Sequence, residues 1–453
     1  MESTTATPPP DGPPAAVADV DQAKVRRAAF GGLAGTALEQ YDFVIYGTAS
    51  AIIFNKLFFP DVSPVVGVLA SFATYAVGFG ARPLGGLFFS RFGDRYGRKW
   101  VLVTTLFLMG FSTLAIGLLP TYQQVGVLAP ALLVLCRLLQ GFGAGAEQVG
   151  GIVLLTEMAR PGRRGRLSSM VFVGAAIGTA LGAVAWMAAQ ALPDDALLSW
   201  GWRLVFLSST VVTIAAFVLR RKLDESPVIN ELKAASSQTD TPVAHVVKHS
   251  KPGLARVFFM MVGVSCQSYT YQVFMGSYLI TVLKVDAHLI PKVLLLGAVC
   301  GMAAAFLAGM LSDVFGRRPL YLAITGLLVV LPVPSFLLLD TGSTWAVYAV
   351  ITVGFFFAAY GAVGVQAAYF PELFGSRHRY AGVALGREFA SVAGGGVAPL
   401  ICSALLAAFA ESWWPVAIYM MAMMAMSFLG AWFSPETRDR ALTVFEDARL
   451  ART

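Results

Sequence analysis

Charged residues are scarce in this sequence, since Lys, Arg, Asp and Glu together account for only 13% of its 453 residues. Histidine and cysteine are rarer still, with four of each. The cysteines are scattered through apolar stretches and no pair has the spacing of metal ligands, so we expect neither a disulfide framework nor a metal site. A nucleophile–base pair and a glycine-rich phosphate loop are also missing, which argues against an enzyme and suggests no cofactor.

Long apolar runs are the main feature of the chain. Hydrophobic residues make up 57% of it, and its mean hydropathy is +0.69. The runs are continuous and about 20 residues long, the length that a helix needs to cross the hydrocarbon core of a membrane. We count twelve candidate spans, with eleven or thirteen as alternatives because two of them begin softly. They start near residues 30, 65, 100, 127, 167, 203, 255, 291, 319, 345, 380 and 413.

Basic residues are distributed unevenly around these spans. Of the 33 Lys and Arg, 26 fall in ends and loops on the side of the two termini and four on the opposite side, while Arg82, Arg137 and Arg387 lie inside spans. The positive-inside rule then places both termini in the cytoplasm, and the protein in the plasma membrane. The net charge of +7 follows from this topology, so we expect the lipid bilayer as a partner and no nucleic acid.

Three short segments occur twice, in the same order and at nearly one offset. The stretch "SRFGDRYGRK" is echoed by "GMLSDVFGRR", "EMARPGRRG" by "ELFGSRHRYAG", and "DESP" by "SPET". The repeated acidic residues are Asp94 and Asp313, Glu157 and Glu372, and Glu225 and Glu436, at offsets of 219, 215 and 211. Such an order predicts two parallel six-helix halves.

The halves and their connections follow from this repeat. We expect a disordered cytoplasmic tail at 1–27, a first half at 28–220, a cytoplasmic linker at 221–253, a second half at 254–434 and a cytoplasmic tail at 435–453. The repeated charge clusters then lie in the turns after the second and eighth spans.

These clusters have two interpretations. The simpler one is an anchor that follows the positive-inside rule. An anchor does not require a repeated aspartate, so we favour a latch that joins the halves and breaks when they rock. The predicted latch residues are Asp94, Arg95, Arg98, Asp313, Arg317, Glu157 and Glu372.

The first cluster resembles the loop signature Gly-x-x-x-Asp-Arg-x-Gly-Arg-Lys of the major facilitator superfamily, with Ser90 in place of the first Gly. From about Arg27 to Pro435 the chain is similar to the metabolite:proton symporters of that superfamily, which include shikimate, α-ketoglutarate, citrate and proline/betaine carriers. The similar stretches include "GTALEQYDFVIYG", "RLLQGFGAGAE", "LSWGWRLVFL" and "ELFGSRHRYAG". Gln40 and Gln148 depart from the pattern, since the subgroup usually has Trp at both positions.

The resemblance implies an all-α membrane protein with the major facilitator fold, in which twelve transmembrane helices form two pseudo-symmetric six-helix halves. It also implies proton-coupled symport of a small organic acid or related metabolite by alternating access, in a functional monomer. Proton-coupled export, substrate antiport and carriage of a zwitterionic compatible solute remain alternatives. A channel is disfavoured because a latch between halves serves a rocking mechanism.

Charged residues inside spans are costly and call for a function. Glu39 and Asp42 are three residues apart on the first span, so we expect them to share a face that Tyr46 continues. In related sugar–proton carriers an Asp of the first helix faces an Arg of the fourth, and Asp42 and Arg137 match those positions. The resemblance therefore implies proton coupling, with Asp42 binding a proton when Arg137 turns towards substrate.

Alternatives to this coupling remain open. A static salt bridge between Asp42 and Arg137 is one, and Glu39 and Glu147 are further candidates for the proton site. The predicted substrate-binding residues are Gln40, Tyr46, Arg82, Gln140, Gln148, Gln272 and Arg387. For Arg82 the alternative is a structural pairing with acidic groups. Adjacent residues of a helix point about 100° apart, so we expect only one of Arg387 and Glu388 to face a central cavity.

Overall fold

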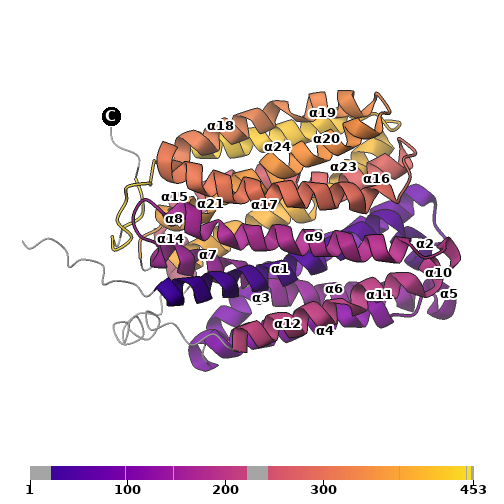
Figure 1. Ribbon diagram of the computed structural model, residues 1–453, viewed down its shortest axis with the longest axis horizontal. Helices are drawn as coiled ribbons and strands as arrows, with labels where there is room; N and C mark the ends of the chain where they lie inside the picture. Colours follow the sequence, from indigo (N-terminus) through magenta and orange to yellow (C-terminus); the bar gives the residue numbers. More distant parts are fainter. Residues whose placement is uncertain are drawn as a thin grey trace, which may run out of the picture.

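The computed structural model describes residues 22–96, 98–145, 147–221, 243–376, 378–444 and 446–449, and their side chains except at 22–24, 90–102, 147, 219–221 and 243–245. All regular elements in this part of the chain are helices, and they run side by side along one long axis (Figure 1). We call the end of the bundle where the described chain begins and finishes the terminal end, and the opposite end the far end. The predicted tail up to residue 21 and the linker residues 222–242 lie outside the described residues.

The first half of the bundle is coloured indigo to magenta in Figure 1. Its long helical segments are α1 (Gln22–Ile52), α3 (Pro64–Tyr96), α4 (Arg98–Leu118), α6 (Leu128–Ala144) with α7 (Glu147–Met158), α8 (Arg164–Ser168) with α9 (Met170–Gln190), and α11 (Trp202–Leu207) with α12 (Ser209–Arg221). Short elements connect them at the far end: α2 (Phe54–Phe58), α5 (Tyr122–Val125), α10 (Asp194–Ala196) and η1 (Leu197–Gly201).

The second half begins with the short helix α14 (Val243–His249) at the terminal end. Its long segments are α15 (Lys251–Tyr269) with η2 (Thr270–Phe274) and α16 (Met275–Thr281), α17 (Leu289–Phe315), α18 (Arg317–Val330) with α19 (Pro332–Leu339), α20 (Thr344–Gly354) with η3 (Phe355–Gly361) and α21 (Ala362–Leu373), α22 (Arg379–Ala390) with η4 (Ser391–Gly396) and α23 (Ala398–Ala408), and α24 (Trp414–Trp432). The η segments are wide turns of π type, which interrupt helices mostly near functional sites.

The expected membrane character is confirmed. Eight helical spans of the described chain are long and apolar enough to cross a membrane, and a ninth follows if α18 and α19, bent by 42°, count together. Large apolar side chains such as Phe111, Val211 and Ile418 are more than half exposed on the outside of the bundle, where lipid would cover them. The helical segments α1, α4 and α15–α16 correspond to the first, third and seventh predicted spans, but they are not among the spans that are long and apolar enough. The full count of twelve is therefore confirmed only in part.

Gly141, Gly143 and Gly145 recur within one predicted span, a pattern that favours close approach to a neighbouring helix, and α6 lies directly against α3. A Cβ atom at Gly141 would be 1.8 Å from the carbonyl oxygen of Gly78, and one at Gly145 would be 2.0 Å from that of Arg82. No side chain fits into such a contact, so the two main chains touch. This packing places the helices that carry Arg82 and Arg137 next to each other.

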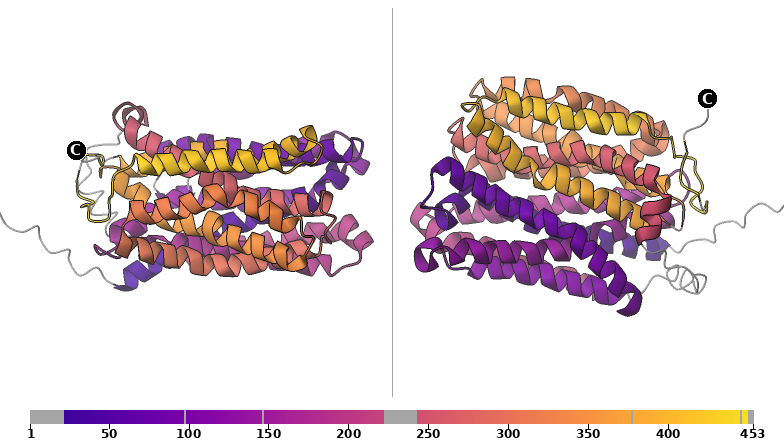
Figure 2. Two further views of the ribbon diagram at one scale, coloured as in Figure 1. Left: turned by 90° about the horizontal axis from the view of Figure 1, so that it is seen from above. Right: turned by 180° about the vertical axis from the view of Figure 1, so that it is seen from behind.

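The two halves lie one above the other, as the views from in front and from behind both show (Figures 1 and 2). Helices α1 and α9 of the first half and α17 of the second lie at the junction, and α9 packs against both of the others. Most of the predicted site residues lie on helices that border this junction.

Candidate functional site

A buried cluster of one guanidinium and two carboxylates joins the halves. Arg82 of α3 lies between Glu39 of α1 and Glu388 of α22, with Nη2 2.9 Å from Glu39 Oε1 and Nε 2.8 Å from Glu388 Oε2. Each of the three residues is 5% exposed or less. Arg82 therefore has the structural pairing that was the alternative to substrate binding, and it ties α1 and α3 to the other half.

Arg387, the neighbour of Glu388 on α22, points to a different partner. Its Nη2 donates to Gln148 Oε1 of α7 at 2.6 Å, which is a second contact between the halves. Its Cζ lies 5.4 Å from the centre of the Phe172 ring. The buried Nε and Nη1 atoms have no hydrogen-bond partner among the described residues.

Two glutamines form a third contact between the halves. Gln40 of α1 donates from Nε2 to Gln272 Oε1 at 3.0 Å, and Gln272 donates in turn to Ser268 Oγ at 2.8 Å. Tyr269 beside them is only partly buried, and its ring centre lies 5.0 Å from that of Phe79.

Asp42 lies away from this group, although it is only three residues from Glu39. Its Oδ2 accepts a hydrogen bond from Thr113 Oγ1 of α4 at 2.8 Å, and its Oδ1 accepts one from Ser209 Oγ of α12 at 2.7 Å. Glu39 and Asp42 have different partners although they are three residues apart on α1, because Glu39 pairs with Arg82 of α3 whereas Asp42 contacts α4 and α12.

The direct Asp42–Arg137 ion pair expected from the resemblance is also absent from the described contacts. A chain of polar groups links the two residues instead, because Arg137 Nη1 donates to Gln140 Oε1, and Gln140 Nε2 donates to Thr113 Oγ1 at 2.7 Å. Thr113 then donates to Asp42. The hydroxyl and the amide separate the charges while keeping them in one network.

Aromatic rings enclose the guanidinium of Arg137. Its Cζ lies 3.9 Å from the centre of the Tyr46 ring, and 5.2 Å from those of Phe43 and Tyr75. Stacking of this kind stabilises a buried cation. The hydroxyl of Tyr46 forms a hydrogen bond with Thr74 Oγ1 at 2.6 Å, in which either oxygen can donate. Because its ring stacks on the guanidinium, this predicted substrate residue forms part of the Arg137 pocket.

The terminal end holds the predicted latch residues that the structure describes. Asp313 of α17 accepts hydrogen bonds from the backbone amides of Gly165 and Arg166 of α8, each at 2.8 Å. It also forms an ion pair with Arg317 at 2.8 Å. A Cβ atom at Gly165 would be 2.2 Å from the carbonyl oxygen of Gly309, so α8 and α17 touch through their main chains. The first half thus rests directly on the second half here.

Two more predicted latch residues connect the halves nearby. Glu372 of α21 pairs with Arg317 at 3.1 Å and with Arg164 of the first half at 3.5 Å, and Glu157 of the first half pairs with Arg379 at 2.7 Å. The two repeated glutamates are therefore both paired across the junction. The predicted residues Asp94, Arg95, Arg98 and Glu147 lie outside the described side chains.

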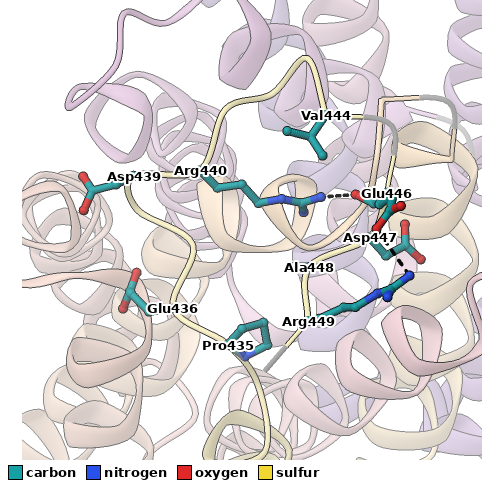
Figure 3. Close-up of a pocket in the computed structure, with 9 residues that line it drawn as sticks. All are labelled: Pro435, Glu436, Asp439, Arg440, Val444, Glu446, Asp447, Ala448 and Arg449. Atoms are coloured by element: carbon teal, nitrogen blue, oxygen red, sulfur yellow. Dashed lines mark hydrogen bonds and ion pairs between the residues drawn. The ribbon is translucent and has the colours of Figure 1, made fainter. Parts of the chain in front are cut away.

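The chain after Pro435, which we call the tail, covers these ion pairs. Glu436 accepts hydrogen bonds from the backbone amides of Arg317 and Arg318 at 2.9 Å each. Three arginines bind tail carbonyl groups: Arg164 at Arg440, Arg379 at Leu442 and Arg256 at Ala448, at 2.6 to 2.7 Å. The tail folds around an open pocket of about 440 Å³, in which Arg440 points towards Glu446 (Figure 3).

A smaller contact connects the halves at the far end. His288 Nε2 lies 3.1 Å from the carbonyl oxygen of Gln190, and its Nδ1 lies 2.8 Å from Asp286 Oδ1. The hydrogen bond that the His288 ring donates to this carboxylate raises the pKa of His288, and the hydrogen bond that the His288 backbone amide donates lowers the pKa of Asp286. Both neighbours of the ring are acceptors, so only the protonated imidazole satisfies both of them.

Sequence reasoning missed several of these residues. Glu388 was not among the predicted site residues, because only one of the adjacent residues Arg387 and Glu388 was expected to face a central cavity. Both are buried, and each has its own partner. Thr113 and Ser209 were missed because hydroxyl residues are common in apolar spans and carry no special pattern. Arg164 and Arg379 were visible in the repeats, seven residues after the paired glutamates, and that spacing could have placed them in the latch.

Comparison with known proteins agrees with this architecture. The family model described as "Major Facilitator Superfamily" matches residues 33–399, which is most of the chain, and the chain belongs to that family. Among solved structures, the xylose transporter XylE from E. coli in a partially occluded inward-open conformation has a TM-score of 0.70 at 18% identity, covering 93% of this chain and all of the other. At that identity the likeness concerns the fold.

Curated relatives are transporters of small metabolites. The shikimate transporter of Escherichia coli K12 is 36% identical over 413 residues, covering 90% of this chain and 94% of its own. The inner membrane metabolite transport protein YhjE of the same organism is 36% identical over 425 residues, with the same coverage. The glycine betaine/proline/ectoine/pipecolic acid transporter OusA of Dickeya dadantii is 30% identical over 434 residues, covering 93% and 86%. The chain is thus a multi-pass membrane transporter and not an enzyme.

Proposed function

We propose that the protein carries out proton-coupled symport of a small organic acid, by alternating access between its two halves. The observation that carries this proposal is the balance of buried charge in the groups around Arg82, Arg387 and Arg137. Each of the six ionisable residues involved is 5% exposed or less. They are the carboxylates Glu39, Asp42 and Glu388 and the guanidiniums Arg82, Arg137 and Arg387.

The balance favours coupling because the formal charges of these six groups, all of them with described side chains, sum to zero. An anion that enters alone leaves one uncompensated negative charge in a medium of low dielectric constant, which is costly. A proton that enters with the anion restores neutrality. Carriage of an acid together with a proton is therefore the transport mode that this set of residues favours.

Asp42 is our first choice for the proton site. It accepts hydrogen bonds from two hydroxyl groups, and its hydrogen-bonded link to the guanidinium of Arg137 runs through Thr113 and Gln140. If Arg137 moved, the hydrogen bonds of Gln140 and Thr113 would rearrange with it, and the charge balance around Asp42 would change. Glu39 and Glu147 are the alternatives to test next.

Alternating access requires contacts between the halves that form and break in turn. Candidates for the contacts at the terminal end are the pairs made by Asp313, Glu372 and Glu157, with Asp94, Arg95 and Arg98 expected to act in the same way. We place the terminal end in the cytoplasm, following the charge asymmetry of the loops. We also propose that one chain is the functional unit, with the two halves 28–220 and 254–434 moving against each other.

The test is uptake into proteoliposomes with and without an imposed inward proton gradient. The panel contains shikimate, which the name of one relative suggests, together with other mono-, di- and tricarboxylates and glycine betaine. We expect accumulation of one or more acids that depends on the gradient and is abolished by a protonophore. Uptake that ignores the gradient would contradict the symport proposal.

A second candidate function is carriage of a zwitterionic compatible solute. It is favoured by the similarity to OusA, whose name includes glycine betaine and proline. The same panel separates the two, because a zwitterion carrier would accumulate glycine betaine in preference to every acid. Exchange of internal for external substrate without a proton gradient would identify an antiporter.

A further inference from the structure

Arg387 has binding capacity that the protein itself does not use. A guanidinium has five N–H donors. Gln148 is bonded to Nη2, whereas Nε and Nη1, which carry three of the five, have no partner in the described part of the chain. The residue is only 3% exposed, so bulk water does not fill this role. Buried donors of a cation without acceptors are costly, which indicates that an acceptor binds there during the cycle.

The other buried guanidiniums are already engaged. Arg82 is paired with two carboxylates, and Arg137 is enclosed by three aromatic rings and bonded to Gln140 and the carbonyl oxygen of Tyr75. Arg137 keeps one buried N–H group, on Nε, without a partner in the described contacts, against the three of Arg387. Arg387 also lies at the junction of the halves, where its bond to Gln148 joins α22 to α7. It is therefore the buried cation best placed for a group that arrives from outside.

We propose that Arg387 binds the carboxylate of the transported acid and that the substrate class is a hydroxylated monocarboxylate. This deepens the proposed function and rests on it. A carboxylate matches the unused N–H groups in charge and geometry. The partly buried Gln40 and Tyr269 offer hydrogen-bonding groups for hydroxyls, and Glu39 Oε2, which lacks a partner in the described contacts, is an acceptor for one.

The same geometry disfavours acids with more than one carboxylate. A second carboxylate would need a second cation with unused donors, and the remaining buried arginines are paired or enclosed as described above. A dicarboxylate would also bring an extra negative charge next to Glu39 and Glu388. We therefore expect discrimination against succinate or citrate even where the size of the acid is suitable.

The experiment measures binding and transport for Arg387→Gln and Arg387→Lys. The probes are the monocarboxylate of the panel that the wild-type protein accumulates most, its uncharged methyl ester, and succinate. For Arg387→Gln we expect the dissociation constant of the acid to rise at least tenfold and that of the ester to stay within about twofold. For Arg387→Lys, which keeps a point charge without the planar fork, we expect an intermediate loss.

The matched control is Arg203→Gln, which removes an arginine at the far end whose guanidinium binds the carbonyl oxygens of Ser199 and Leu119. Size-exclusion profiles in detergent establish that each variant is folded, and Arg387→Lys serves as the readout if Arg387→Gln does not fold. Three results would each overturn the inference. They are an equal loss of affinity for the acid and the ester in Arg387→Gln, an unchanged affinity for the acid in that variant, and a preference of the wild-type protein for succinate over the monocarboxylate. Failure of the proposed function is distinct, because then the wild-type protein shows no gradient-driven uptake of any acid.

Discussion

The contact between α8 and α17 at the terminal end makes a quantitative prediction about the equilibrium between open and closed states. Asp313 accepts two backbone N–H groups of the opposite half at 2.8 Å each. Asp313→Asn keeps one acceptor oxygen and replaces the other with an amide that cannot accept. One charge-assisted hydrogen bond between the halves is then lost and the second is weakened.

The size of the effect follows from these two bonds. A hydrogen bond to a charged group contributes about 1.5 to 3 kcal/mol. A net loss of about 2 to 3 kcal/mol changes an equilibrium constant by about 30- to 150-fold. The open state of the terminal end should gain by this factor, because that state has no such contact to lose.

Thiol accessibility measures this equilibrium directly. Ser168 of α8 is fully buried and bonded to Thr156, so Ser168→Cys reports opening in a background whose four native cysteines are replaced by alanine. Asp313→Asn should raise its rate of modification by at least tenfold. Asp340→Asn, which removes a far-end carboxylate bonded to Trp413, should leave the rate unchanged.

A steric change at the same contact provides an independent check. A Cβ atom at Gly165 would clash with the carbonyl oxygen of Gly309, whereas one at Gly150 would meet nothing within 4 Å. Gly165→Ala should therefore open the terminal end as Asp313→Asn does, and Gly150→Ala should not. If neither Asp313→Asn nor Gly165→Ala changes the rate by more than about threefold, the contact does not hold the halves together and the reasoning fails.

Three further predictions concern coupling, pH and packing. Asp42→Asn should abolish accumulation against a gradient and retain counterflow exchange, since a neutral side chain imitates the proton-bound carrier; gradient-driven accumulation by this variant would move the proton site to another carboxylate. The pKa of His288 is raised by its bond to Asp286, so the far-end contact with α9 is complete below about pH 6.5 and is lost as the pH rises through the raised value. Distances between spin labels at the far ends of α9 and α17 should lengthen with pH in the wild-type protein and stay constant in His288→Asn. Gly141→Ala should destabilise the protein by about 1 to 3 kcal/mol through overpacking, whereas Gly80→Ala, with open space around it, should leave thermal unfolding unchanged.

The sequence predicts those parts of the structure that repetition or spacing marks. Asp313, Glu372 and Glu157 could be placed at one contact because each has a repeated counterpart. Gly141 and Gly145 predicted a close helix contact, since glycines four residues apart form a flat strip on one face of a helix. These inferences need only one helix or one turn at a time.

The central ion cluster could not be predicted in this way. Arg82 and Glu388 are 306 residues apart, and their meeting depends on how the two halves face each other. The direction of Asp42 depends on which neighbour supplies hydroxyl groups, and Thr113 and Ser209 look like ordinary residues of apolar spans. The resemblance suggested Arg137 as the direct partner of Asp42, whereas Gln140 lies between them in the network.

The tail is held mainly through its main chain. Arg164, Arg256 and Arg379 bind carbonyl oxygens of the tail, which every amino acid provides. Leu442 and Ala448 contribute only their carbonyl oxygens to these bonds, so their side chains can vary. The described side chains that form bonds of their own outside the tail or within its fold are more constrained, and they are those of Glu436, Thr437, Arg438, Arg440 and Asp447. The length of the tail is constrained instead, since a shorter tail would leave arginines of both halves without acceptors. A peptide tag is consequently better attached after the last residue than substituted for any part of the tail.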